Sequence, residues 1–204
     1  MNTLIIKIYV IMPIIGLHGS IGSGKSTIAK YLVVNYNYEE YALADPLKRI
    51  GEIFYFEPNQ LYGTQENKLE INEHWGISAR KFLQVVGSEL FRDALPKLLP
   101  DMKLNGCSVW IKLLDIYIKK NPKKNLVISD VRFSDEAKYI QSIGGHIIKI
   151  DRKLEQPSDI AKHQSDIAKH QSENQNVSYD IILNNNGSLD DLKKNIDAIA
   201  HVLQ

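Results

Sequence analysis

The sequence predicts an α/β fold with three layers, in which a parallel sheet of about five strands carries helices on both faces. Three observations lead to this prediction. Short apolar runs recur along the chain, helical patterns separate them, and the first run leads through a glycine-rich turn into a helix. Fully apolar strands of this kind are buried on both faces, which is typical of parallel sheets whose crossovers are helices.

The predicted strands are short apolar stretches bounded by polar or glycine-rich turns. The stretch Leu-Val-Ile-Ser, for example, ends at Asp130, and Asp180-Ile-Ile-Leu ends at a turn of three asparagines and a glycine. The strands are expected at residues 14–17, 41–44, 126–129, 146–150 and 180–183.

The predicted helices place their apolar residues three or four positions apart, so that one face is buried. Ser78 and Ser188 are expected to cap two helix starts, Pro96 is expected to end the longest helix, and Gly144 another. The helices are expected at residues 26–35, 47–56, 78–95, 109–119, 135–143 and 189–203.

Length and composition favour one globular domain across residues 1–204. The chain is 44% hydrophobic and 24% charged, and its formal net charge is +1, so no global field favours nucleic acid or an anionic membrane. The single cysteine, Cys107, forms no internal disulfide, which favours a reducing, cytoplasmic location. Residues 1–11 have no place in the predicted sheet, and we expect an N-terminal extension there, with Met12 as the functional start.

The stretch GSIGSGKST at residues 19–27 has the pattern of a phosphate-binding loop. It fits G-x-x-x-x-G-K-[ST] at every fixed position and lies between a predicted strand and a predicted helix. Glycines let the backbone aim N–H groups at phosphate, Lys25 can reach the β- and γ-phosphates, and the Ser26 hydroxyl can bind Mg²⁺. The residues expected to bind nucleotide here are Gly19, Gly22, Ser23, Gly24, Lys25, Ser26 and Thr27.

Asp130 and Arg132 follow the apolar run at 126–129 and are expected at the sheet edge that carries the phosphate loop. Asp130 can order the water shell of Mg²⁺ or contact substrate, and Arg132 can neutralise charge on a transferred phosphoryl group. Lys25, Arg132 and Asp130 are therefore the predicted catalytic residues, and Ser26 and Asp130 the predicted metal ligands.

The remaining motifs separate a small-molecule kinase from other phosphate-loop proteins. The base-reading element of a GTPase is absent from the late strand end, which reads LNNNG, and the further motifs of large ATP-driven motors are also absent. Arginine and lysine residues are scattered over several segments, as is required to hold two anionic substrates in line.

The ordered motifs resemble the phage-type deoxynucleoside monophosphate kinases, from about residue 14 to the C-terminus. This resemblance implies the P-loop nucleoside monophosphate kinase fold and the reaction ATP + dNMP → ADP + dNDP. It also implies ATP and Mg²⁺ as cofactors and a homodimer, with no nucleic-acid or membrane partner. The motifs are GSIGSGKST (19–27), LADPLK (43–48), SARKFLQVVGSELFR (78–92), VWIK (109–112), VISDVRFSDEAKYIQSIGGHIIKIDR (127–152), DIAKHQSE (166–173) and DIILNNNGSLDDL (180–192).

The resemblance also implies a substrate-binding insertion at 45–112 and a lid at 151–178. Arg80 is expected to grip the acceptor phosphate, Gln84 to read a base edge and Trp110 to stack on a base. Arg152 is expected on the lid side near the ATP phosphates, and the turn at 184–189 near adenine. The predicted substrate-binding residues are Asp45, Lys48, Arg80, Gln84, Gly87, Ser88, Trp110, Lys112, Asp130, Arg132 and Glu136.

The predicted lid contains an immediate repeat, because SDIAKHQ occupies residues 158–164 and again 165–171. Seven residues are close to two helical turns, so a helix can absorb such a duplication without changing its buried face. The second copy keeps the terminal acid, so Asp166, His170 and Glu173 align with the family's single lid segment. Either the repeat is a tolerated duplication, or it doubles the lysine and histidine of a working lid.

Two other kinases and one binding protein are alternatives. Animal-type phosphomevalonate kinases share parts of the pattern, and dephospho-CoA kinase shares the general fold but fits the central motifs less well. The run Lys119-Lys-Asn-Pro-Lys-Lys124 permits a nucleic-acid-binding role, although a solvated turn explains it more simply.

Overall fold

The computed structural model describes residues 13–153 and 176–203, which form two compact units. Unit 1 contains residues 13–40, 121–153 and 176–203, and unit 2 contains residues 41–120. The predicted lid repeat and the predicted extension at 1–11 lie outside the described residues.

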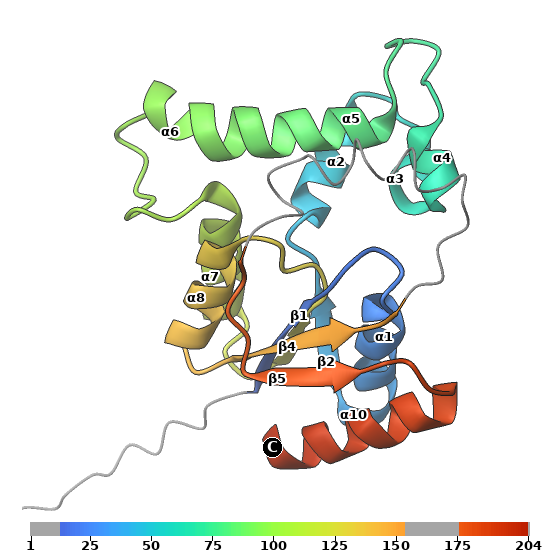
Figure 1. The fold of residues 1–204 in the computed structure, drawn as a ribbon. Coiled ribbons are helices and arrows are strands. Elements are labelled where there is room, and N and C mark those ends of the chain that lie inside the picture. The colour runs from blue at the N-terminus through green and yellow to red at the C-terminus, as the bar shows by residue number, and fades with distance from the viewer. Residues whose placement is uncertain (1–12, 154–175, 204) are drawn as a thin grey trace, which may run out of the picture. The chain divides into compact units, whose positions relative to one another are not determined.

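The sheet has five strands in the described part of the chain, in the order β2-β3-β1-β4-β5 (Figure 1). The strands are β1 (Ile14–His18), β2 (Tyr38–Tyr41), β3 (Asn125–Ile128), β4 (His146–Asp151) and β5 (Ile181–Asn184). β1 pairs in parallel with β3 and β4, and β4 pairs in parallel with β5. The predicted α/β fold with a parallel sheet of five strands is therefore confirmed.

Helices cover both faces of this sheet. Ile15 and Leu17 of β1 pack in a buried cluster with α1 (Lys25–Tyr36) and α10 (Leu189–Leu203) on one face. On the other face, Gly16 leaves room for Ile140 of α8 (Ser134–Ser142), because a Cβ at Gly16 would lie 3.2 Å from the Ile140 Cδ1 atom. Strands buried on both faces must be apolar throughout, which is why the sequence shows uninterrupted apolar runs.

Unit 2 is helical, and its helices contribute a separate core around Phe56, Leu61 and Phe82. The longest helical stretch runs from α5 through η1 to α6, and Figure 1 shows the three segments as one continuous helix. The helices of unit 2 are α2 (Asp45–Ile53), α3 (Pro58–Tyr62), α4 (Gln65–Leu69), α5 (Ala79–Gln84), the π-helix η1 (Val85–Ala94), α6 (Leu95–Leu98) and α7 (Val109–Lys120).

Two predicted boundaries in this region are wrong. The second strand lies at Tyr38–Tyr41 and not at 41–44, because it is an edge strand that accepts a half-buried Glu39 and an exposed Glu40. The apolar run that suggested the later position instead enters a turn, in which Asp45 N–H donates to Ala42 O at 3.1 Å.

Pro96 does not end the long helix, which continues to Leu98. The turn before it is a π-turn, since Leu95 N–H donates to Leu90 O, five residues back. Pro96 then occupies the first turn of α6, where a missing N–H costs little. The short helices α3 and α4 were not predicted, because five-residue helices carry too little periodicity to detect.

Among residues 13–153 and 176–203, no helix has both the length and the apolar character to cross a bilayer.

Candidate functional site

The carboxyl edge of the sheet in unit 1 gathers the polar segments that the sequence singled out. The phosphate loop follows β1, Asp130 follows β3, Arg152 follows β4 and Asn185 follows β5. All these strand ends meet at one edge, since the strands that carry them are parallel. Open parallel sheets bind ligands at this edge, next to the central strands.

The loop at residues 19–24 has the backbone that a phosphate site requires. Gly22 and Gly24 have φ angles of 78° and 104°, a left-handed region that glycine enters without strain. Ser23 N–H donates to Ser20 O at 3.2 Å and closes the turn. Helix α1 begins at Lys25, so its first N–H groups and its positive dipole end lie at the loop.

Lys25 and Ser23 indicate that this loop fits a polyphosphate group. Lys25 Nζ donates to Gly19 O at 2.6 Å and to Ser20 O at 2.7 Å, so the cation is held against the loop backbone. Ser23 is fully buried, and its hydroxyl has no hydrogen-bond partner among the described residues. A Cβ at Gly19 would lie 2.8 Å from that hydroxyl, so position 19 has no room for a larger residue.

Two side chains from other strand ends hold successive carbonyls of the loop. Arg152 Nη1 donates to Gly22 O at 3.4 Å, which places this predicted residue at the loop. Asn185 Nδ2 donates to Ser23 O at 2.8 Å. Asn185 was not predicted individually, although it belongs to the asparagine-rich turn at 184–189 that was expected near adenine.

The segment after β3 is fastened to the end of β1. Val131 N–H donates to Leu17 O at 3.2 Å, and His18 Nδ1 lies 3.0 Å from Val131 O. Asp130 is half-buried and Arg132 is exposed, so both predicted residues border the segment where β1 passes into the phosphate loop.

Glu136 is buried and supports the backbone around Arg132. Its Oε2 accepts hydrogen bonds from Arg132 N–H at 2.9 Å and from Phe133 N–H at 3.0 Å, at the start of α8. A carboxylate is favourable there, because helix N-termini carry unpaired N–H groups and a positive dipole end. The observed contacts give Glu136 a positioning role, and direct contact with substrate stays a prediction.

Ser26 and Thr27 are exposed in the first turn of α1. No cluster of three or more histidine, cysteine, aspartate or glutamate residues able to hold a metal ion occurs within the described ranges. A cation bound through Ser26 and Asp130 would therefore take its other ligands from phosphate oxygens and water, as is usual for Mg²⁺.

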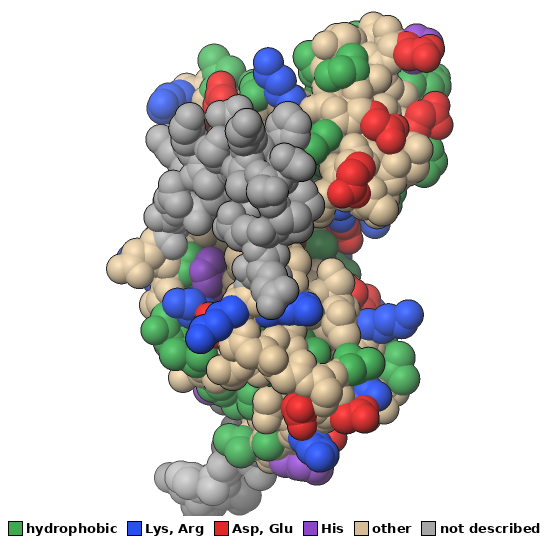
Figure 2. Space-filling view, turned by 45° about the vertical axis from the view of Figure 1, so that its right-hand side comes forward, with side chains coloured by type: hydrophobic (Ala, Val, Ile, Leu, Met, Phe, Trp, Pro, Cys, Tyr) green, Lys and Arg blue, Asp and Glu red, His purple; other side chains and the backbone are tan. Residues whose placement is uncertain are grey.

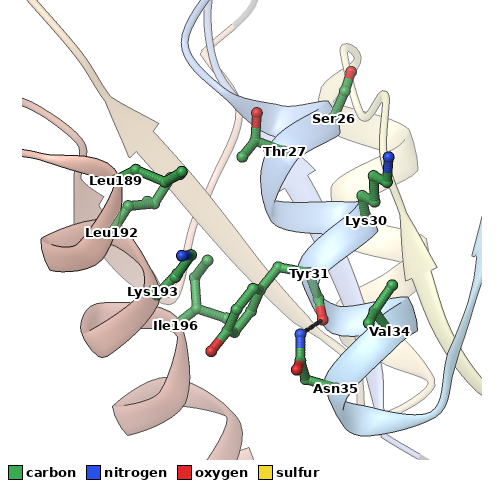
Figure 3. Close-up of a pocket in the computed structure, with 10 residues that line it drawn as sticks. All are labelled: Ser26, Thr27, Lys30, Tyr31, Val34, Asn35, Leu189, Leu192, Lys193 and Ile196. Carbon is green, nitrogen blue, oxygen red and sulfur yellow. Dashed lines mark hydrogen bonds between the residues drawn. The ribbon is translucent and has the colours of Figure 1, made fainter.

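A groove of about 430 Å³ lies between α1 and α10, beside the end of the phosphate loop. Figure 3 shows Thr27 and Leu189 at one end and the Tyr31 ring farther along. Leu192 and Ile196 belong to its apolar side, and both are almost fully buried. Much of the groove surface is thus apolar, although Lys30, Asn35 and Lys193 also line it, and the groove begins at Ser26 and Thr27 in the first turn of α1.

Unit 2 contains most of the predicted acceptor-binding residues. Lys48 Nζ and Asp45 Oδ1 form an ion pair at 2.8 Å in α2, and the same ammonium lies 5.2 Å from the centre of the Tyr62 ring. Arg80 Nη1 donates to Gln65 Oε1 at 2.8 Å. Arg80 and Gln84 are half-buried and one turn apart in α5, as the sequence predicted.

Gly87 and Trp110 pack against each other in unit 2. The Trp110 indole N–H donates to Gly87 O at 3.0 Å, and its ring lies 5.5 Å from that of Phe91. Trp110 is 7% exposed, so these contacts give it a packing role, and base stacking by this ring stays a prediction. Ser88 is half-buried beside Gly87, and Lys112 Nζ lies 3.7 Å from Asp115 Oδ2.

The π-helix η1, which carries Gly87 and Ser88, is a feature that sequence reasoning missed. Wide π-turns inside helices are frequent at functional sites. No residue pattern in this segment differs from that of an ordinary amphipathic helix, so the sequence offered no signal.

Comparisons with known proteins agree with this geometry. A model of the deoxynucleotide monophosphate kinase family matches residues 51–196. A protein of Acanthamoeba polyphaga mimivirus, provisionally named a deoxynucleotide monophosphate kinase, is 39% identical over 191 residues, which cover 91% of this chain and 94% of the relative.

Among solved structures, TT1252 from Thermus thermophilus aligns with a TM-score of 0.53 at 21% identity, over 95% of this chain and 98% of the other. A dephospho-CoA kinase from Campylobacter jejuni aligns with a TM-score of 0.47 at 18% identity, over 93% and 96% of the two chains. At 21% identity, the Thermus thermophilus structure bears on the fold alone, whereas the sequence matches span most of the chain. With its phosphate loop and its matching sequence, the chain belongs to the deoxynucleotide monophosphate kinase family.

Proposed function

We propose that this protein transfers the γ-phosphoryl group of ATP to a deoxynucleoside 5′-monophosphate and forms the diphosphate. The observation that carries the proposal is the phosphate loop in a chain of this family. In it Lys25 lies against the loop backbone, two glycines are left-handed, and the buried Ser23 hydroxyl has no hydrogen-bond partner in the described part of the chain. A site of this kind positions and neutralises phosphate and needs no general base, because a phosphate acceptor is already ionised.

In this proposal, unit 1 holds the donor nucleotide. Lys25 binds the β- and γ-phosphates, and Arg132 neutralises charge that develops on the transferred group. Mg²⁺ would be held by Ser26, with Asp130 ordering its water, and supplies charge neutralisation at the phosphates. Arg152 contributes a further cation beside Gly22.

The groove between α1 and α10 is the proposed site for the nucleoside part of ATP. Its end at Thr27 and Leu189 adjoins the phosphate loop, so a nucleotide bound by its phosphates would place its base there. A largely apolar lining with a small number of polar groups is typical of sites that bind small molecules.

Unit 2 is the proposed acceptor-binding part of a single kinase. Charged side chains of this unit form local ion pairs, such as the pair of Asp45 and Lys48. Such a pair holds both side chains in defined positions. The residues assigned to the acceptor there are Asp45, Lys48, Arg80, Gln84, Gly87, Ser88, Trp110 and Lys112.

The lysine run at 119–124 offers little support for a nucleic-acid-binding role. Lys119 pairs with Asp115 at 2.7 Å, and Lys124 pairs with Glu39. On the face drawn in Figure 2, lysine and arginine side chains lie in small separate groups with acidic side chains between them. A continuous basic stripe is what nucleic-acid binding favours.

Release of ADP from Mg-ATP, measured with a panel of acceptors, tests this function. The panel contains dTMP, dGMP, dCMP, dAMP, their ribose counterparts and phosphomevalonate, and K25A serves as the negative control. Turnover with one or more deoxynucleotides supports the proposal and names the base preference. Turnover with phosphomevalonate alone, or hydrolysis that no acceptor stimulates, contradicts it.

A further inference from the structure

Asn185 is a buried polar residue just after β5 that makes two well-defined hydrogen bonds. It is 7% exposed. Its main-chain N–H donates to Asp151 O at 2.8 Å, which ties it to the end of β4. Its side-chain Nδ2 donates to Ser23 O at 2.8 Å, which ties it to the phosphate loop. One residue thus joins two strand ends to the loop.

The bond to Ser23 sets the direction of one N–H group of the loop. A trans peptide carries its C=O and N–H on opposite sides, and no cis peptide occurs among the described residues. Holding the Ser23 carbonyl toward Asn185 therefore turns the Gly24 N–H to the opposite side. In that orientation, the Gly24 N–H can serve with the first N–H groups of α1 as a donor to an anion.

The packing at this contact leaves little freedom. A Cβ at Gly24 would lie 2.5 Å from Asn185 Nδ2, so the amide sits directly against the loop backbone. Only the amide nitrogen of the Asn185 side chain can donate to the Ser23 carbonyl. An aspartate of the same shape would place a carboxylate oxygen against that carbonyl oxygen. Arg152 makes the neighbouring contact to Gly22 O at 3.4 Å, but from an exposed position.

We infer that Asn185 is a positioning residue for the donor nucleotide. It holds the Ser23–Gly24 peptide so that the Gly24 N–H faces bound phosphate, and it acts through the loop without touching the reacting atoms. This inference rests on the proposed function in one respect, since it takes the loop to be the site of a nucleoside di- or triphosphate.

Binding of ADP, measured by titration calorimetry, tests the inference with a matched pair of variants. N185D keeps the volume of the side chain but removes the donor to Ser23 O and adds a negative charge, so the uncharged N185S is measured beside it. N195D makes the same chemical change in α10, where Asn195 Nδ2 donates to Asn184 O at 3.4 Å from an exposed position. We expect N185D to weaken ADP binding by about tenfold or more, and N195D to stay within about threefold of the wild type.

A steady-state measurement separates positioning from a general loss of structure. N185D should raise the KM for ATP by about tenfold while the acceptor KM stays within about twofold, because unit 2 is unchanged. Should N185D fail to fold, N185S provides the same test, since its hydroxyl is too short to reach Ser23 O.

Wild-type affinity for ADP in a folded N185D or N185S overturns the inference. An equal rise in both KM values also overturns it, because that result indicates a structural role only. If the wild type binds ADP and phosphorylates no acceptor, the proposed function fails while the calorimetric test of Asn185 still stands.

Discussion

Lys25 is the side chain whose removal should reduce turnover most. Its ammonium is held by Gly19 O and Ser20 O, where it can neutralise the β- and γ-phosphates. We expect K25A to lose about 10³-fold or more in turnover while its thermal unfolding is unchanged. K138A, an exposed lysine on α8, is the matched control. Near-normal turnover of K25A would remove Lys25 from the mechanism.

Substitution of Arg132 and substitution of Glu136 should affect turnover and stability differently, although the two residues are adjacent in the structure. Arg132 is exposed, so R132A should lose turnover by about 10²-fold or more without losing stability. Glu136 is buried and accepts two backbone N–H groups, so E136A should lose both turnover and about 1–3 kcal/mol of unfolding free energy. Activity assays combined with urea denaturation distinguish a loss of turnover alone from a loss of turnover together with stability. A stable but inactive E136A would instead indicate direct substrate contact.

Helices α1 and α10 are joined by a clasp in which Asp197 accepts hydrogen bonds from Tyr36 and Tyr31. The O–O distances are 2.7 Å to Tyr36 and 2.9 Å to Tyr31. The bond from Tyr36, and then that from Tyr31, holds the pKa of Asp197 below its ordinary value of 3.8. The bond to Asp197, with some desolvation, raises the pKa of Tyr36 from 10.0 to about 12.

The lowered pKa of Asp197 and the raised pKa of Tyr36 predict the pH range over which the clasp stabilises the protein. A carboxyl with a lowered pKa contributes fully above its unfolded value and loses that contribution as pH falls through its folded pKa. A phenol with a raised pKa contributes fully below about pH 10 and loses it as pH rises through about 12. The difference in Tm between wild type and D197A should therefore be largest near neutral pH and shrink toward both extremes. A difference that stays constant from pH 3 to pH 7 would show that the charge of Asp197 is irrelevant.

The π-helix η1 packs closely on α2 through Gly87. A Cβ there would lie 2.6 Å from the Leu47 Cδ2 atom, and the position is buried. The contact is with one methyl group at the end of the Leu47 side chain, so G87A should cost about 1 kcal/mol of unfolding free energy through overpacking. E89A, at an exposed position of the same helix, should have little effect. Equal stability of the two variants in chemical denaturation would mean that Leu47 moves aside freely.

At the scale of the whole chain, deletion of one copy of the tandem repeat tests whether the repeat is functional. Residues 158–164 lie outside the described part, and the prediction rests on the seven-residue repeat alone. Seven residues correspond to about two turns of a helix, so removal of one copy would keep the face that a helical segment presents, and the deleted protein should fold and retain turnover. Thermal unfolding and the acceptor assay check this. Loss of turnover in a folded protein would show that the doubled segment has become functional.

Sequence patterns were sufficient wherever one local rule governed an element. The apolar runs marked four of the five strands, and the fixed glycines and lysine marked the phosphate loop. Sequence patterns were insufficient where contacts with neighbouring elements outweighed the local preference of the residues. The edge strand β2 accepts glutamates because one side of it is unpaired, and Pro96 is tolerated because a π-turn precedes it.

By itself, the sequence determined the α/β class, the phosphate loop and the family, because each depends on residue types at fixed spacing. Only the tertiary structure decided how the strand ends support that loop. The bond from Asn185 to Ser23 joins residues 162 positions apart, and the parallel order of β1, β4 and β5 brings them together. The tertiary structure likewise decided that Glu136 binds backbone N–H groups and that Trp110 is packed inside unit 2. Spacing along a chain records none of these contacts, since each exists only after distant strands and helices have packed.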